Sequence, residues 1–379
     1  MRITDVRTAE VLGHGYSTFV RIYTDEGLFG TGECIHGGAG CPRLVATMTE
    51  LLRGEDPRDV EPLFERIRRR YLFEGALAGN VVTALAGIEI ALWDLAGKAL
   101  GAPVYRLLGG RYRDRIRLYC DCHGGKEDTP ASHAEQALAA AALGFTALKF
   151  DVDDLTHPAK ADRWNHTLNA REMASMVEKV AAVREAVGPS IDLAIDMHGR
   201  YDTHSAIRLA RALEPFELMW LEEPVPPENV DAMREVKRCS PVPICAGENL
   251  FLRWGFRDLL EKQAVDIIMP DLPKCGGLAE GKKIAGMAEL YYIPIAPHNV
   301  CGPLGTLASC HAGAAIPNFL VLEWHWLERP YWNDLLIVDA PLIQNGAIRV
   351  PDRPGLGYEL NEDVAQHYLR PGTTLFGEA

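Results

Sequence analysis

From about Gly110 onward the chain repeats one unit, a short apolar, β-type run followed by a longer helical run. Eight such β-type runs precede residue 330, at residues 116–121, 146–151, 191–197, 218–222, 242–246, 265–269, 292–296 and 319–323. Strands that alternate with helices predict βα units around a parallel sheet, and eight of them predict a closed barrel. No other feature of the sequence restricts the fold as much.

The first hundred residues follow a different pattern. Residues 18–31 alternate in strand fashion around a turn at Asp25, which predicts a hairpin in an antiparallel meander. Residues 42–100 have apolar positions spaced by three and four, which predicts helices. We therefore expect three parts, namely an α+β capping domain over 1–110, a barrel domain over 111–329, and a Pro- and Gly-rich segment over 330–379 that returns to the capping domain.

Charge and cysteine content limit the partners and the compartment. The 52 acidic and 39 basic residues give a net charge of −13, which disfavours binding to nucleic acid. The most apolar stretch, 81–95, contains Glu89 and Asp94 and lacks the ~18 uncharged residues of a membrane span. The nine cysteines form no CxxC pair. At the N-terminus the acidic residue Asp5 precedes any apolar run of the kind that a signal sequence contains. We expect reduced thiols, no secretory signal and a cytoplasmic location.

Ionisable residues stand at the carboxyl ends of the predicted strands, where barrels of this kind place their reactive groups. Asp196, Glu222 and Glu248 follow one another at intervals of 26 residues, one in each βα unit. Three carboxylates directed at one point repel one another unless a cation lies between them, and oxygen ligands suit Mg²⁺ better than Zn²⁺. We predict one Mg²⁺ per subunit at these three residues.

Two histidines have positions that suit proton transfer. The two-residue period of a strand places His198 on the same face as Asp196. Asp271 and His298 end neighbouring strands, from which the carboxylate can orient the imidazole and favour its protonated form. Each pair is also compatible with a purely structural hydrogen bond. The predicted metal site beside the pairs favours a catalytic role over a structural one.

Longer motifs around these residues resemble the enolase superfamily, specifically its mandelate racemase subgroup. Residues 87–98 are similar to that family's capping-helix signature, and the barrel motifs follow in order as Leu221-Glu222-Glu223-Pro224, Ala246-Gly247-Glu248-Asn249, Asp271-Leu272-Pro273-Lys274-Cys275-Gly276-Gly277 and Pro297-His298-Asn299. The resemblance covers nearly the whole chain. It implies an α/β fold, a modified TIM-type (β/α)7β barrel with an N-terminal α+β capping domain.

The resemblance also implies a role for each matching residue. In such sites a Lys or His base removes a proton, and bound Mg²⁺ stabilises the enolate that forms. The implied roles are Mg²⁺ ligand for Asp196, Glu222 and Glu248, base for His298 with Asp271, and the acid that helps to stabilise the enolate for Glu323.

The second strand departs from the subgroup's pattern. The subgroup commonly has Lys-x-Lys there, its second lysine serving as the base on the opposite face, whereas this chain has Lys149-Phe150-Asp151. A racemase needs comparable bases on both faces of the substrate, so a carboxylate at Asp151 in place of the second lysine disfavours racemisation. A dehydratase needs one base and one acid. His298 can be the base, and His198 resembles the histidine of galactonate-dehydratase-like members that assists departure of the 3-hydroxyl.

We therefore predict a Mg²⁺-dependent acid sugar dehydratase, a carbon–oxygen hydro-lyase that forms a 2-keto-3-deoxy sugar acid. Lys149 is expected near the substrate carboxylate, where it can stabilise developing charge together with Mg²⁺. Four further residues are expected to contact substrate, namely Asp151, His14, His36 and Trp164.

Alternatives remain at this stage. A sugar-acid lactone cycloisomerase or an epimerase shares the proton abstraction and differs only after the enolate, and a non-catalytic barrel could bind a ligand without chemistry. The expected partners are a small anionic sugar acid and further copies of the same chain in a homo-oligomer, with no nucleic acid and no membrane. Which sugar acid is bound remains open.

Overall fold

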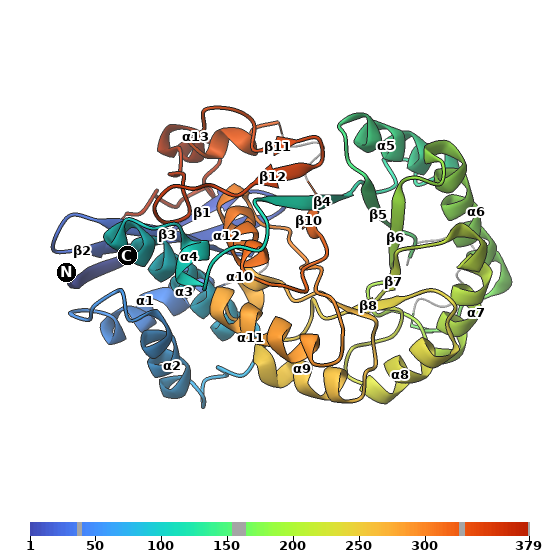
Figure 1. Cartoon of the computed structure of the whole chain (residues 1–379), viewed down its shortest axis with the longest axis horizontal. Coiled ribbons are helices and arrows are strands. Elements are labelled where there is room, and N and C mark those ends of the chain that lie inside the picture. Colours follow the sequence, from blue (N-terminus) through green and yellow to red (C-terminus); the bar gives the residue numbers. More distant parts are fainter. Residues whose placement is uncertain (36–39, 154–163, 326–329, 378–379) are drawn as a thin grey trace.

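The computed structural model describes residues 1–35, 40–153, 164–325 and 330–377. In Figure 1 the N-terminal elements lie at the left and the barrel strands with the first barrel helices lie at the right, while the later barrel helices lie between them. The N-terminal sheet is antiparallel in the order β1-β2-β3. Its strands and the helices that follow are β1 Ile3–Leu12, β2 Tyr16–Thr24, β3 Phe29–Cys34, α1 Cys41–Met48, η1 Thr49–Leu51, α2 Val60–Arg70, α3 Gly79–Leu100 and α4 Val104–Leu107.

Helix α3 is the core helix of this half. It packs against β3, where glycines allow the closest approach: a Cβ atom on Gly32 would lie 2.3 Å from the carbonyl oxygen of Gly87. Gly101 ends the helix in the left-handed conformation, with φ of 63°. By length and composition α3 could also cross a membrane, but most of it is buried within the fold, which is typical of a core helix.

The second half is a parallel barrel. Its strands run in the order β4-β5-β6-β7-β8-β9, and β10 pairs in parallel with β4. The strands are β4 Arg115–Asp121, β5 Ala147–Asp151, β6 Asp192–Asp196, β7 Trp220–Glu222, β8 Ile244–Ala246, β9 Ile267–Ile268 and β10 Leu322–Trp324. The helices between them are α5 Pro130–Ala142, α6 Ala170–Val187, α7 Thr203–Leu213, η2 Glu214–Phe216, α8 Val230–Cys239, α9 Leu252–Glu261, α10 Leu272–Cys275, α11 Leu278–Glu289 and α12 Pro303–Ala314.

The seventh predicted strand, 292–296, differs from the prediction. Only Ile295 pairs there, through single parallel bridges to Ile268 and to Phe319. Pro294 and Pro297 flank it and have no backbone N–H to donate to a ladder. The ring therefore closes between β9 and β10 through isolated bridges.

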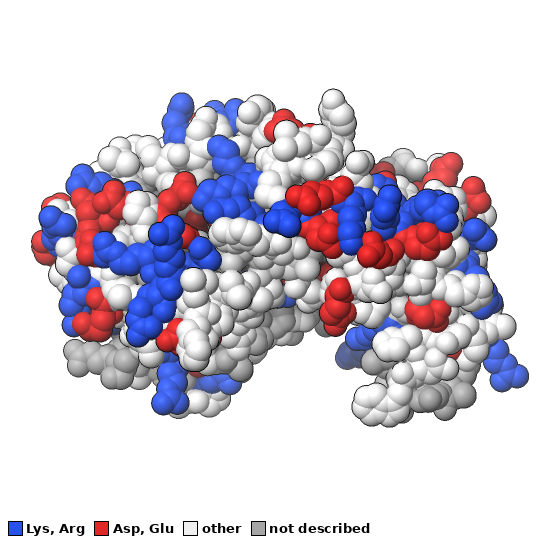
Figure 2. Space-filling view, turned by 90° about the horizontal axis from the view of Figure 1, so that it is seen from below, with Lys and Arg blue, Asp and Glu red and all other residues white. Residues whose placement is uncertain are grey.

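The C-terminal segment contacts both halves. Its elements are η3 Asn333–Leu335, β11 Ile343–Gln344, β12 Ala347–Arg349 and α13 Glu362–His367. Strand β12 pairs antiparallel with β4, and Leu369 forms an antiparallel bridge with Val11 of the N-terminal sheet. On the face shown in Figure 2, basic and acidic side chains are interspersed.

Two buried glutamates of the N-terminal half hold the barrel helices. Glu33 of β3 accepts hydrogen bonds from the backbone N–H groups of Gly302 and Gly305 at the start of α12. Glu89 of α3 accepts from Leu278 and Ala279 at the start of α11, at 2.9 Å each. A carboxylate at a helix N-terminus satisfies free N–H groups and complements the helix dipole. These contacts fix the two halves relative to each other.

We expect Glu89 to make stability depend on pH. Burial raises the pKa of Glu89 from 4.5 to about 7, so the folded state binds a proton that the unfolded state releases above pH 4.5. The stability that Glu89 contributes is complete below that pH and declines as pH rises to about 7, by at most about 3 kcal/mol. In Glu89→Gln this dependence is absent. Urea unfolding at pH 5 and pH 7.5 should show the variant gaining relative to the parent at the higher pH, and a pH-independent difference would contradict the assignment.

Candidate active site

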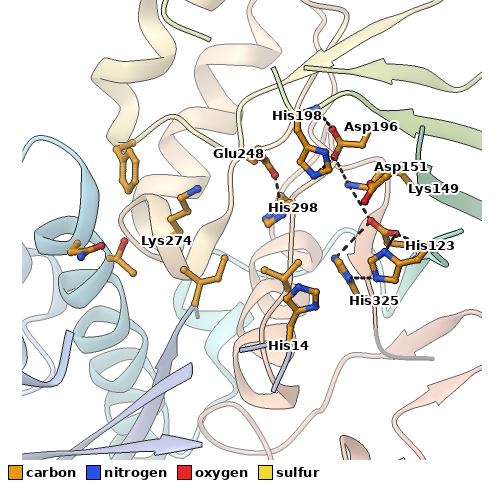
Figure 3. Close-up of a pocket in the computed structure, with 16 residues that line it drawn as sticks. His14, His123, Lys149, Asp151, Asp196, His198, Glu248, Lys274, His298 and His325 are labelled. Carbon is orange, nitrogen blue, oxygen red and sulfur yellow. Dashed lines mark hydrogen bonds and ion pairs between the residues drawn. The ribbon is translucent and has the colours of Figure 1, made fainter. Parts of the chain in front are cut away.

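A pocket of about 410 Å³ lies at the carboxyl ends of the barrel strands (Figure 3). Both halves of the molecule contribute to its wall. From the N-terminal half come His14, Ile35, Asn80 and Thr83. From the barrel come Asp121, His123, Lys149, Asp151, Asp196, His198, Glu248, Phe251, Lys274, His298, Val300 and His325.

Three carboxylates converge beside this pocket. Asp196 and Glu222 end β6 and β7, on which they are register partners, and Glu248 lies just after β8. One oxygen from each lies within 4.8 Å of the others. Burial, together with the charge of Asp196, raises the pKa of Glu222 well above its usual value. Buried carboxylates this close require a cation, and an all-oxygen set fits Mg²⁺. The sequence prediction that these residues come together is confirmed.

Lys149 lies at the centre of the site. Its Nζ is 2.7 Å from Glu323 Oε1, 3.0 Å from Glu222 Oε1 and 3.2 Å from Asp196 Oδ2. Burial alone would favour the neutral amine, but the charges of Glu222 and Glu323 hold the pKa of Lys149 well above its usual value. The side chain is therefore a buried ammonium that faces carboxylates.

Glu323 is ionised in this arrangement. Burial raises its pKa, but the charges of Lys149 and His298 outweigh burial and lower it below the usual value. An acid role for Glu323, expected from the sequence, requires a protonated carboxyl, whereas the contact with Lys149 at 2.7 Å and the lowered pKa of Glu323 favour the ionised form in this arrangement.

His298 and Asp271 form a close pair. The Nδ1 atom lies 2.6 Å from Asp271 Oδ2, and Asp271 is fully buried. The other nitrogen, Nε2, lies 3.0 Å from Glu248 Oε2. Burial favours the neutral imidazole, but Glu323 and Glu248 raise the pKa of His298 well above its usual value. His298 lines the pocket, and a cation held by Glu248 would offset the negative charge that raises the pKa of this ring.

His198 lies on the other side of the carboxylates. Its Nδ1 is 3.1 Å from Asp153 Oδ1, and its Nε2 is 3.9 Å from Asp196 Oδ2. Arg200 Nη1 holds Asp153 from the far side at 2.6 Å. Burial favours the neutral ring, but Asp153 and Asp196 raise the pKa of His198 to about 10. The ring is therefore protonated at neutral pH.

Asp151 occupies the position of the expected second lysine. It lines the pocket between Lys149 and Asp196 (Figure 3). Burial and the charges of Asp121 and Asp196 raise its pKa well above the usual value. A carboxyl in this setting holds a proton, and it cannot act as a strong base.

The remaining predicted substrate contacts have different outcomes. His14 lines the pocket, as expected. Trp164 is 91% exposed and is not among the described residues that line the pocket. His36 lies outside the described residues.

Four ionisable residues that line the pocket were not predicted as site residues, namely Asp121, His123, His325 and Lys274. Asp121 is the last residue of β4, and His123 follows it by two. His325 follows Glu323 by two, at the end of β10. The strand-end rule applied to the first and last strands would have found these three. Lys274 lies in a short helix after Asp271 and gave no periodic signal.

Comparison with protein families matches both halves of the chain. Residues 7–109 match the family model described as "Mandelate racemase / muconate lactonizing enzyme, N-terminal domain". Residues 132–364 match the model described as "Enolase C-terminal domain-like". The resemblance and the fold class inferred from the sequence are thereby confirmed.

Individual proteins agree with this result. The chain is 46% identical to a D-xylonate dehydratase of Haloferax volcanii over 99% of this chain and 91% of that protein. It is 35% identical to a D-galactonate dehydratase of Xanthomonas campestris, over 91% and 89%. A crystal structure of a mandelate racemase/muconate lactonizing enzyme-like protein from Rubrobacter xylanophilus superposes with a TM-score of 0.96, at 51% identity and 99% coverage of both chains.

Proposed function

Because the chain belongs to the mandelate racemase/muconate lactonizing enzyme family of the enolase superfamily, we propose that it is a Mg²⁺-dependent acid sugar dehydratase. It removes the proton alpha to a carboxylate and eliminates the 3-hydroxyl, which gives an enol that ketonises to a 2-keto-3-deoxy sugar acid. The observation that carries the proposal is the placement of two histidines, His298 paired with Asp271 and His198 paired with Asp153, beside a single carboxylate cluster.

His298 acts as the base in this proposal. The buried Asp271 accepts a hydrogen bond from Nδ1–H, which fixes the tautomer and leaves Nε2 to take the proton. The imidazolium that forms is stabilised by the same carboxylate at 2.6 Å.

The developing enolate needs positive charge, because a proton beside a carboxylate is only weakly acidic. Mg²⁺ held by Asp196, Glu222 and Glu248 supplies Lewis-acid stabilisation of that charge when it is bound. Lys149 adds a buried ammonium whose field is little screened by water.

His198 supplies the acid. A leaving hydroxyl must be protonated, and an imidazolium with pKa of about 10 carries its proton at pH 7. Asp153 orients the ring through Nδ1, so that Nε2–H is the proton to be transferred.

The relatives suggest which substrates to test first. The relatives named D-xylonate and D-galactonate dehydratase favour aldonic acids of five and six carbons. The test is a screen of aldonic acids and their lactones with Mg²⁺, following 2-keto-acid formation and deuterium exchange at C2. Keto-acid formation is the expected result. Deuterium exchange without keto-acid formation would favour an epimerase. Turnover of lactones would favour a cycloisomerase. Absence of both activity and metal binding would favour a non-catalytic barrel.

Replacing His198 by Asn should separate the two chemical steps. Loss of the acid is expected to lower dehydration by ~10²–10⁴-fold, while C2 exchange continues because His298 and the cation still form the enolate. The two rates are measured on the same substrate by keto-acid assay and by NMR in D₂O. His204→Asn, an exposed imidazole on α7, is the matched control and should change neither rate.

Other outcomes would reassign the acid. Equal loss of both rates would indicate that His198 orients the metal ligands or the substrate. If Asp151→Asn stops elimination selectively and His198→Asn does not, the acid is Asp151, whose raised pKa keeps it protonated.

We also propose a cytoplasmic location and a homo-oligomer. All nine cysteines are free, which supports a reducing compartment. Phe73 and Leu77, on the turn after α2, are 99% and 63% exposed and would be covered by a second copy. Light scattering coupled to size exclusion gives the mass in solution.

A further inference from the structure

A second group of ligand atoms lies in the same pocket, beyond Lys149 from Asp196 (Figure 3). We call it the Asp–His cluster, which consists of Asp121, His123 and His325. Each offers one oxygen or nitrogen, and these atoms lie within 4.8 Å of one another. They come from the ends of β4 and β10, two strands that pair in parallel. Two neighbouring strand ends therefore hold the cluster in place.

The spacing of the cluster suits a metal ion. His325 Nδ1 lies 3.2 Å from His123 Nε2, His123 Nδ1 lies 3.4 Å from Asp121 Oδ1, and His325 Nε2 lies 3.7 Å from Asp121 Oδ2. Ligands about 2.0–2.2 Å from a tetrahedral ion are separated from one another by roughly 3.3–3.6 Å. The three contacts have similar lengths, and one nitrogen of each ring and one oxygen of Asp121 lie within 4.8 Å of one another.

The chemistry of the cluster also suits a cation. Burial lowers the pKa of His325 to about 4, so this ring is neutral at pH 7 and has a free electron pair. Neutral imidazole is the form that binds metals. Lys149 is a single ammonium, and it faces carboxylates of Asp121, Asp196, Glu222 and Glu323.

We propose that the Asp–His cluster binds a divalent transition-metal ion of the Zn²⁺ type, at a site distinct from the carboxylate trio. Two imidazoles and one carboxylate suit Zn²⁺, Co²⁺ or Ni²⁺, whereas the trio has only oxygen ligands and suits Mg²⁺. His14, on the turn between β1 and β2, covers the cluster, with its ring centroid 4.9 Å from that of His325. The N-terminal half thus closes over the ion. This inference does not depend on the proposed dehydration.

The test uses the full chain, stripped with a chelator and then saturated with Mg²⁺. Zn²⁺ is added during calorimetry, and bound metal is counted by elemental analysis after dialysis. The expected result is one equivalent of Zn²⁺ in addition to Mg²⁺. The double variant His123→Ala with His325→Ala should bind Zn²⁺ roughly 100-fold more weakly or worse. Co²⁺ used in place of Zn²⁺ should give the visible absorption of an imidazole-ligated ion in the parent and not in the variant.

Controls separate this site from the first one. His204→Ala should leave Zn²⁺ binding unchanged, and Asp196→Asn with Glu248→Gln should lose Mg²⁺ while it keeps Zn²⁺. His123→Ala alone removes a half-exposed side chain, so it tests the cluster if the double variant does not fold.

Three outcomes would overturn the proposal. They are no uptake of Zn²⁺ at saturating Mg²⁺, equal uptake by the parent and the cluster variants, and loss of uptake in the variant of the carboxylate trio. If the cluster variants raise KM for a sugar acid and the parent takes up no Zn²⁺, the cluster contacts substrate and binds no metal. A failure of the proposed function appears separately, as an absence of keto acid from the Mg²⁺-loaded parent.

Discussion

His298→Asn is expected to lower both C2 proton exchange and dehydration by ~10²–10⁴-fold, the usual contribution of a general base. Asn keeps the approximate size of the side chain and a hydrogen-bond donor toward Asp271, but it has no basic nitrogen. Because the base acts before elimination, both rates should fall together, in contrast to the result expected for His198→Asn. The measurement is NMR exchange in D₂O alongside the keto-acid assay.

Asp271→Asn provides the companion measurement. Asp271 acts through the imidazole at 2.6 Å, so it is a positioning residue. Asn in its place no longer stabilises the imidazolium, and we expect a lower kcat and a pH–rate profile whose acidic limb, which reports the pKa of His298, moves to lower pH. Near-parental exchange in His298→Asn would show that another group removes the proton. An unchanged pH profile in Asp271→Asn would limit that residue to a structural role.

Asp196→Asn combined with Glu248→Gln is expected to abolish Mg²⁺ binding and to remove activity by roughly 10²–10³-fold or more, since a Lewis acid contributes several kcal/mol. Both substitutions keep the shape of the side chain and remove its charge. With two ligands neutral, the remaining carboxylate of Glu222 is already paired with Lys149 at 3.0 Å. The measurements are calorimetric titration with Mg²⁺ and the keto-acid assay.

Glu235→Gln, an exposed carboxylate on α8, is the control for loss of one surface charge and should bind Mg²⁺ as the parent does. If the double variant remained folded and bound Mg²⁺ with parental affinity, the metal site would lie elsewhere. Thermal melting with and without Mg²⁺ gives a second readout, because a bound ion stabilises only the protein that holds it.

Local sequence patterns were enough to predict the centre of the site. Asp196, Glu222 and Glu248 each follow a β-type run, one per βα unit, and parallel strands bring their carboxyl ends to one edge. The two-residue period likewise places His198 near Asp196. These predictions depend only on periodicity and on the rule that the strands are parallel, both of which a single sequence contains.

Other features depend on contacts between distant segments. The Asp–His cluster exists because β10 pairs with β4, more than 200 residues earlier in the chain. The seventh strand is reduced to bridges at Ile295 because prolines interrupt its ladder. Trp164, expected at the pocket, is 91% exposed, and its surroundings could not be read from the local sequence pattern.

The sequence by itself determined which residue types stand at the strand ends, and hence that acids, a lysine and histidines share one edge of the barrel. Only the tertiary structure decided how they pair. Lys149 Nζ lies 2.7 Å from Glu323 Oε1, and this contact lowers the pKa of Glu323 although burial raises it. Periodicity sets the face to which a side chain points. Closure of the barrel sets burial and the distance to the next charge, and these two quantities fix the pKa.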